Sequence, residues 1–182
     1  MPEISLNILD VVQNSVTAGA SLTEVGIAAD TAADTLEVTV QDNGHGMSPE
    51  QVERVTDPFF TTRTTRKVGL GIPFLKMAAE ITGGSFHIES SLGVGTRTTA
   101  VFGLRHIDRM PMGDIASTMT ALIGPSPDID FILRYRVDDK SFVLDTREMR
   151  EILEGVPLSE PAVLTYVADY INENLAETGE RL

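Results

Sequence analysis

The chain lacks cysteine altogether and has only three histidines among its 182 residues. Without thiols it forms neither disulfides nor thiolate metal sites, and three scattered histidines do not suggest a metal cluster. The sequence also has no apolar run of membrane-spanning length and no basic, apolar leader. From these absences we expect a soluble protein that stays in the cytoplasm and does not bind a membrane.

Positive charge is scarce as well: 14 Lys and Arg face 27 Asp and Glu, a formal net charge of −13. A chain this acidic is repelled by a phosphate backbone, so nucleic acid is a poor candidate partner. What the chain does have is apolar residues, 42% of the total, which is enough for a sizeable core. Its length favours one globular domain, or one domain with a small addition.

Helix and strand patterns alternate over the first 105 residues. Apolar side chains at helical spacing predict a helix over residues 3–20 and another over residues 69–84, between glycines. Ser48 and Pro49, with Gln51 three positions after the serine, predict a short helix over residues 48–55. The remaining apolar runs predict strands, at residues 24–30, 35–42, 85–91 and 96–104.

The remaining residues, 106–182, differ in charge and pattern. They carry 7 Lys and Arg against 15 Asp and Glu, compared with 7 against 12 for residues 1–105. Their pattern predicts a helix at about 111–123, a hairpin turning at 138–140, and two further helices, the last at about 160–177. We therefore divide the chain into a domain over residues 1–105 and a compact α+β appendage over residues 106–182.

Two glycine-containing stretches, in this order, indicate a nucleotide pocket. Asp42 ends a predicted strand, where its carboxylate can accept a hydrogen bond from an exocyclic amine such as adenine N6. Gly44 and Gly46 follow, and because they have no side chains they let a base approach the backbone closely. Gly69 and Gly71 open a helix, whose free N–H groups and positive dipole end attract phosphates.

Charged and polar side chains complete this predicted site. Asp10 and Asn14 lie one turn apart on one helix face, which places a carboxylate beside an amide oxygen. That pair suits holding Mg²⁺ and orienting a water, because Mg²⁺ takes only one or two protein oxygens when phosphates supply others. Arg63, Arg66 and Lys67 gather three basic residues within five positions, which indicates an anionic ligand nearby. Taken alone, each feature also has an ordinary structural explanation, as a solvated helix face or a solvated loop.

Five short stretches resemble the N, G1, F, G2 and G3 boxes of the Bergerat-type ATP-binding fold, the superfamily of DNA gyrase, the heat-shock chaperone, histidine kinases and MutL. They read ILDVVQNSVTAGA, DNGHGM, DPFFTTR, VGLGI and GVGT, in that order, and the resemblance extends over roughly residues 4–104. The resemblance implies an α/β two-layer sandwich, with helices on one face of a mixed sheet, followed here by the appendage. It also implies ATP and Mg²⁺ as ligands.

The resemblance assigns a role to each matching residue. It implies that Asn14 ligates Mg²⁺, that Asp42 binds adenine and that Thr96 lies near the base. It also implies that residues 61–68 form a lid over the nucleotide. The pocket and lid residues that it implies are Gly44, Gly46, Met47, Gly69, Leu70, Gly71, Arg63, Arg66 and Lys67.

Within the superfamily, different boxes resemble two different subfamilies. QNSVTAGA is closest to the MutL style of N box, whereas DPFFTTR through GVGT is similar to a histidine-kinase catalytic domain. Thr17 stands where kinases often carry lysine, Asp10 where hydrolytic members carry glutamate, and Lys67 where the first glycine of GxGLG is usual. The first two departures argue against fast turnover, while Lys67 adds positive charge where the phosphates should lie.

His106 offers a further possibility. The stretch HIDRMPMGDIASTMTALI, residues 106–123, resembles the phospho-acceptor box of histidine kinases, with His, Arg and Pro in matching spacing before a helix. That box normally precedes the ATP domain, and Ile107 stands where an acidic residue is usual. The alternative is that His106 merely joins the last strand of the first domain to the appendage. His45 and His87 are expected to face solvent or to pack.

Two functions remain open. As an ATPase or protein kinase, the protein would transfer the γ-phosphate of ATP to water, to His106 or to a protein partner, with Asp10 orienting or deprotonating the attacking group. As an interaction protein, it would use ATP to close the lid and change a surface that a partner recognises, with little or no hydrolysis. Either function is compatible with an oligomer.

Overall fold

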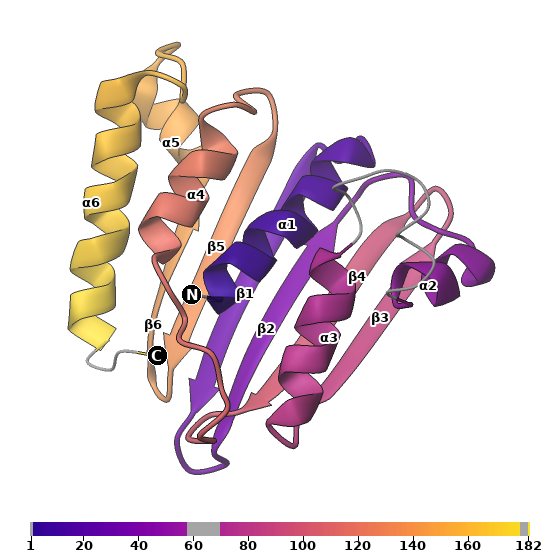
Figure 1. Ribbon diagram of the computed structural model, residues 1–182. Helices are drawn as coiled ribbons and strands as arrows, with labels where there is room; N and C mark the ends of the chain where they lie inside the picture. Colours follow the sequence, from indigo (N-terminus) through magenta and orange to yellow (C-terminus); the bar gives the residue numbers. More distant parts are fainter. Residues whose placement is uncertain (1, 58–69, 179–181) are drawn as a thin grey trace.

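The computed structural model describes residues 2–57, 70–178 and 182 (Figure 1). Its centre is a six-stranded sheet in the order β3-β4-β2-β1-β5-β6. β1 and β5 run parallel, and every other neighbouring pair is antiparallel, so the sheet is mixed. The strands are β1 (Leu22–Asp30), β2 (Thr35–Asp42), β3 (Ser85–Ser91), β4 (Gly95–Gly103), β5 (Asp130–Val137) and β6 (Lys140–Asp145).

One face of the sheet is covered by helices. Figure 1 shows α1, α3 and α4 lying across this face, with α6 along the side that carries β6 and α2 near β3. The helices are α1 (Ile4–Thr17), α2 (Pro49–Val55), α3 (Gly71–Ile81), α4 (Ile115–Ile123), α5 (Thr146–Leu153) and α6 (Pro161–Thr178). The α/β fold class, with helices on one face of a mixed sheet, is therefore confirmed.

The core lies between this sheet face and the helices. Alternate residues of β1 are buried, as expected where one face of a strand packs and the other does not. Ile4, Ile8 and Val12 of α1 are fully buried at helical spacing, together with Val11. Together these residues fix α1 on the sheet.

The local signals at helix ends are mostly confirmed. Ser48 caps α2: its side chain accepts from the Gln51 N–H, while the Gln51 side chain accepts from the Ser48 N–H. The predicted start of the helix at about 111 is wrong, because α4 begins at Ile115. The Asp114 carboxylate accepts from Ser117 N–H at 2.9 Å and caps the helix there.

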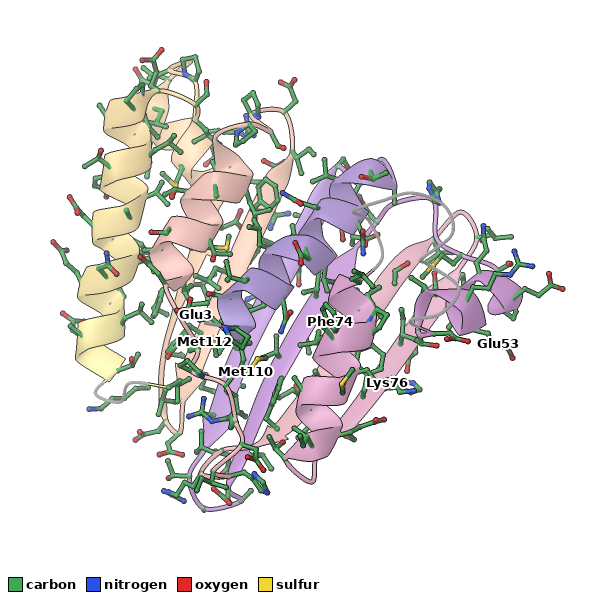
Figure 2. The ribbon with its side chains drawn as sticks, in the orientation of Figure 1. Glu3, Glu53, Phe74, Lys76, Met110 and Met112 are labelled. Atoms are coloured by element: carbon green, nitrogen blue, oxygen red, sulfur yellow. The ribbon has the colours of Figure 1, made fainter. Side chains whose placement is uncertain are left out.

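Residues before α4 pair instead with the start of α1. The Ile4 N–H donates to the Pro111 carbonyl at 3.0 Å, and the Ser5 N–H donates to the Met112 carbonyl at 2.8 Å. Figure 2 shows Glu3 and Met112 side by side at this junction. Carbonyls of the later segment thus satisfy two of the four N–H groups that a helix start leaves without intrahelical partners.

The segment 106–182 contains the predicted helix, hairpin and two helices, and its hairpin extends the central sheet. β5 pairs with β1 in a continuous register from Leu22 opposite Asp130 to Ala29 opposite Val137. Phe131, Leu133 and Tyr135 of β5 are buried in the same core as α1. The division of the chain near residue 105 stays a prediction. Within the described residues, no helix has the length and apolar character needed to cross a membrane.

Candidate nucleotide-binding site

A pocket of about 200 Å³ lies between α1, the C-terminal end of β2, α2 and the start of α3. Most of its wall surface is apolar, and its polar residues include Asp42 and Asn14. Its volume is below the roughly 300–1,000 Å³ of most ligand sites, so the described walls enclose only part of a nucleotide, such as its base. The lining residues are Val11, Asn14, Ser15, Thr17, Ala18, Val40, Asp42, His45, Gly46, Met47, Val55, Ile72, Thr96 and Thr98.

Asp42 is held by two hydrogen bonds. The Ser15 hydroxyl donates to Asp42 Oδ2 at 2.6 Å, and the Gly44 N–H donates to Asp42 Oδ1 at 2.8 Å. Ser15 lies on the buried side of α1 and is 2% exposed. Because each carboxylate oxygen has two lone pairs, both retain capacity for a further donor. The carboxylate is thus oriented before any ligand arrives.

A second network holds the loop after β2. The Met47 N–H donates to Ser90 Oγ at 2.7 Å, and Ser90 Oγ lies 2.8 Å from Thr96 Oγ1 and 3.1 Å from the Gly95 carbonyl. Since Ser90 has one hydroxyl hydrogen, donation to Gly95 leaves Thr96 to donate to Ser90. The β3–β4 hairpin therefore places both Met47 and Thr96 at the pocket.

A side chain at either glycine of this loop, Gly44 or Gly46, would collide with neighbouring protein atoms. Gly46 has φ +71°, and a Cβ there would collide with the Ser91 carbonyl oxygen. A Cβ on Gly44 would lie 2.9 Å from both Cβ and the carbonyl oxygen of Ala18. The expected reason for these glycines was close approach of a base. Contacts with the neighbouring hairpin and with the end of α1 already require both.

Asp10 lies where α1 meets α3. A Cβ on Gly71 would lie 2.6 Å from the Cβ of Asp10, so the absence of a side chain at Gly71 lets the two helices touch. Partial burial here raises the pKa of the Asp10 carboxyl above its ordinary value. Asn14, one turn further along α1, lines the pocket. Asp10 and Asn14 therefore share a helix face, with Asp10 directed toward the start of α3.

The start of α3 is suited to an anion. Leu70, in the N-cap position, makes no side-chain hydrogen bond to the helix, so no N-cap side chain occupies the first N–H groups of α3. Ile72, in the first turn, lines the pocket. The positive end of this helix therefore adjoins the pocket that Asn14 also lines. Arg63, Arg66, Lys67 and Gly69 lie outside the described residues, as does the lid at 61–68.

A family model described as histidine kinase-, DNA gyrase B-, and HSP90-like ATPase matches residues 3–106, more than half of the chain. The chain belongs to this ATPase family. The resemblance seen in the five boxes is thereby confirmed. Residues 3–106 form an ATP-binding domain of this family, related to the catalytic domains of histidine kinases.

Curated relatives match shorter stretches of the chain. A putative sensor protein of Shewanella frigidimarina is 36% identical over 72 residues, which are 39% of this chain and 11% of that protein. Histidine protein kinase DivJ of Caulobacter vibrioides is 40% identical over 65 residues, 34% of this chain and 11% of that protein. The chain thus spans only about a tenth of the length of these relatives.

Two solved structures share the fold. The N-terminal domain of a DNA repair protein has a TM-score of 0.55 at 14% identity, covering 80% of this chain and 53% of that chain. The Aquifex aeolicus MutL ATPase domain complexed with ADP has a TM-score of 0.50 at 16% identity, covering 85% of this chain and 70% of that chain. At these identities the likeness shows the fold alone.

The described residues fit the ligands that the ATPase family implies. The oriented Asp42 carboxylate at the polar side of an apolar pocket suits a flat ring with an exocyclic amine. The Asn14 side chain offers an amide oxygen, and the start of α3 offers N–H groups to phosphates. An amide oxygen is a hard ligand of the kind that Mg²⁺ accepts beside phosphate oxygens.

His106 lies beyond the opposite end of β4 from the pocket. Thr96, near the first residue of that strand, lines the pocket, whereas His106 follows its last residue, Gly103. At a rise of about 3.4 Å per residue, the part of β4 from Thr96 to Gly103 alone separates the two by about 24 Å. This distance argues against phosphoryl transfer to His106 within one chain. His87 is exposed and pairs with Glu89 at 2.9 Å, as expected of a solvent-facing residue.

Sequence reasoning missed three residues of the site. Ser15 and Ser90 hold Asp42, Met47 and Thr96, while the Asn43 side chain accepts from the Ser21 and Leu22 N–H groups and ties the loop to β1. Serine and asparagine are common in loops and helices, so nothing local distinguishes these three. His45 also lines the pocket and its Nδ1 donates to the Gly46 carbonyl at 2.7 Å, although it is exposed.

Proposed function

We propose that the protein binds Mg·ATP in this pocket and transfers the γ-phosphoryl group slowly, to water or to a protein partner. The observation that carries the proposal is the Asp42 carboxylate, held by Ser15 and by the Gly44 N–H at the polar side of an apolar pocket. Phosphoryl transfer depends mainly on positioning and charge stabilisation, which a preorganised site provides. In this proposal residues 1–105 are the nucleotide domain and residues 106–182 the appendage.

Base recognition is assigned to the apolar pocket and Asp42. The exocyclic amine of adenine donates to the carboxylate, while Val11, Val40 and Ile72 contact the ring faces. Thr96, held by Ser90, lies beside Asp42 in the β2–β4 register and lines the same pocket. Guanine presents a carbonyl oxygen where adenine presents the amine, and that oxygen repels the carboxylate. The pocket should therefore prefer ATP to GTP.

The phosphates are assigned to the space between Asn14 and the start of α3. The N–H groups of Gly71 and Ile72 bind phosphate oxygens there, and Asn14 is the residue that would hold Mg²⁺ through its amide oxygen. Bound Mg²⁺ supplies positive charge that offsets the charge of the phosphates. Arg63, Arg66 and Lys67 remain the proposed lid cations.

Asp10 is the proposed proton acceptor. Its carboxyl has a raised pKa because it is partly buried, and a more basic carboxylate accepts a proton more readily from an attacking water or hydroxyl. It shares a helix face with Asn14 and lies against Gly71, so it borders the proposed phosphate space. Asp10 therefore orients the attacking group and takes its proton.

A second candidate function is an ATP-dependent change of surface with little hydrolysis. The packing of Asp10 favours it, because contact of the Asp10 Cβ with Gly71 limits the reach of a side chain already shorter than glutamate. Asp10→Ala distinguishes the two functions. In the enzyme the variant binds Mg·ATP normally and loses at least about a hundredfold in turnover, the lower end of general-base effects. In the interaction protein it changes neither turnover nor ATP affinity.

Calorimetric titration with Mg·ATP and Mg·GTP tests the pocket itself. We expect Asp42→Asn to lose at least about tenfold in ATP affinity, a free energy of about 1.4 kcal/mol. Asp128→Asn, at an exposed loop carboxylate, is the matched control and should bind as the unaltered chain does. Equal affinity of Asp42→Asn and the control for ATP would refute the placement of the base. Unchanged binding of Mg·ATP by Asn14→Ala would refute the placement of Mg²⁺.

A further inference from the structure

A second cavity lies at the opposite edge of the sheet from β3. It is a groove of about 410 Å³ between β6, α5 and α6, the latter two side by side in Figure 1. Three of its apolar residues are exposed to solvent: Val143 by 43%, Ile152 by 79% and Tyr166 by 62%. We call it the α5–α6 groove, and its lining residues are Val143, Leu144, Asp145, Glu148, Met149, Ile152, Leu153, Tyr166 and Tyr170.

One wall of the groove is fixed by Tyr170. Its hydroxyl donates to the Val143 carbonyl at 3.2 Å, and its ring meets that of Phe142 edge-on, at 6.4 Å between centroids. Phe142 in turn stacks on Tyr135 at 5.4 Å. Because the Val143 carbonyl of the edge strand β6 already accepts a hydrogen bond from the Tyr170 hydroxyl, it is less available to pair with a strand of a partner protein. The groove itself is better suited to a helix.

The rim of the groove is acidic. Asp145 is matched by Arg147, whose guanidinium contacts it at 2.8 Å and whose hydrogen bonds hold the pKa of that carboxyl below its ordinary value. Glu148 adds an exposed negative charge, and no Lys or Arg is among the described residues that line the groove. Further exposed acids lie one turn away on the same helices, at Glu151, Asp169 and Glu173.

We propose that the α5–α6 groove binds a short amphipathic helix of a partner protein that carries Lys or Arg beside its apolar residues. Apolar side chains spaced one turn apart would fill the groove against Val143, Ile152 and Tyr166, as in other helix-in-groove complexes. Cationic side chains would contact Glu148 and the exposed ring of Tyr166. The acidic rim repels anionic membranes and nucleic acid, which leaves a cationic protein segment as the matching ligand.

This groove belongs to the segment beyond the ATPase-family match, and its proposed role does not depend on the nucleotide site. A direct test uses a fluorescein-labelled synthetic helix of about 14 residues, with leucine on one face and lysine on the other, titrated with the full chain. We expect binding that weakens as salt is raised. A peptide with glutamate in place of lysine should bind at least tenfold more weakly.

Two pairs of variants locate the binding. Ile152→Ser should weaken peptide binding at least tenfold, whereas Ile107→Ser, at a residue 93% exposed in the turn after β4, should not. Glu148→Lys should also weaken it at least tenfold, whereas Glu160→Lys changes the net charge equally and should have little effect. Both test residues are exposed, so the substitutions leave the core untouched.

Three results would overturn the proposal. One is equal peptide binding by each variant and its matched control. Another is equal binding of the lysine and glutamate peptides, since the acidic rim would then select nothing. The third is a dimer in sedimentation experiments that Ile152→Ser abolishes and Ile107→Ser does not, because a second copy of the chain would then cover the groove.

Discussion

The hydrogen bond from Ser15 to Asp42 provides the sharpest test of how the nucleotide site is built. Ser15→Ala removes a hydroxyl that is 2% exposed and donates to a carboxylate at 2.6 Å. A hydrogen bond to a charged group contributes about 1.5–3 kcal/mol to stability. The higher helix propensity of alanine relative to serine offsets roughly 0.5 kcal/mol of that loss. We therefore expect Ser15→Ala to lower the free energy of unfolding by about 1–2.5 kcal/mol.

That loss corresponds to a fall in Tm of roughly 2–10 °C for a chain of this size. Asp42 would keep its hydrogen bond from the Gly44 N–H but lose the one that fixes its second oxygen. Affinity for Mg·ATP should then fall about tenfold, the equivalent of about 1.4 kcal/mol. Thermal denaturation with and without Mg·ATP measures both effects on one sample, because a ligand that binds only the folded state raises Tm.

Ser117 offers a matched control. Its hydroxyl donates to Asp114 at the same distance, 2.6 Å, but at the exposed start of α4, where the Ser117 N–H still caps the helix through Asp114. We expect Ser117→Ala to lower the free energy of unfolding by less than about 1 kcal/mol and to leave Mg·ATP affinity unchanged. If Ser15→Ala loses stability but binds Mg·ATP as tightly as Ser117→Ala, the reasoning that assigns the base to an oriented Asp42 is wrong.

Three further predictions concern glycine geometry, Asp10 and His106. Gly46→Ala should lower the free energy of unfolding by more than about 2 kcal/mol in guanidinium titrations, because it combines positive φ with a collision at Ser91. Gly93→Ala, at φ +76° in open space, should lose only about 1–2 kcal/mol. The pKa of Asp10 is higher in the folded state than in the unfolded state, so the fold loses stability as pH rises from about 3.9 through the folded-state pKa. Asp10→Asn does not ionise, so its Tm should rise relative to that of the unaltered chain over this pH range. His106→Ala should leave phosphoryl transfer unchanged, measured with ATP labelled on its γ-phosphate.

Each of these predictions has an outcome that contradicts it. Equal losses for Gly46→Ala and Gly93→Ala would mean that the contact with Ser91 is unimportant. A constant Tm difference between Asp10→Asn and the unaltered chain across acidic pH would mean that Asp10 titrates normally. Acid-labile label on the chain that disappears in His106→Ala would contradict the third prediction. Because β4 separates His106 from the pocket, it would mean that one copy of the chain phosphorylates His106 of another.

Short-range patterns predicted most of the elements and the family. The capping box of Ser48 and Gln51, the alternation in β1 and β2 and the glycines around α3 all act within a few residues of chain. The order of the five boxes identified the ATP-binding fold before any contact was known. The boundary of α4 was misplaced because residues 111–114 bind the start of α1 instead of forming a helical turn. Asp114, directly before the apolar run of α4, is a local signal for the observed start, whereas the hydrogen bonds to α1 join residues far apart in the chain.

Local sequence patterns suffice to predict which elements form and which faces are apolar, and they mark Asp42, Asn14 and the pocket glycines as candidate site residues, because these features depend on periodicity and on neighbouring residues. Long-range packing, by contrast, sets three features of the fold: Ser15 and Ser90 orient the site, Gly71 lets α1 touch α3, and β5 pairs with β1 so that the acidic segment 106–182 extends the sheet. These contacts join residues far apart in the chain. They depend on packing between elements, which leaves no local trace in either partner.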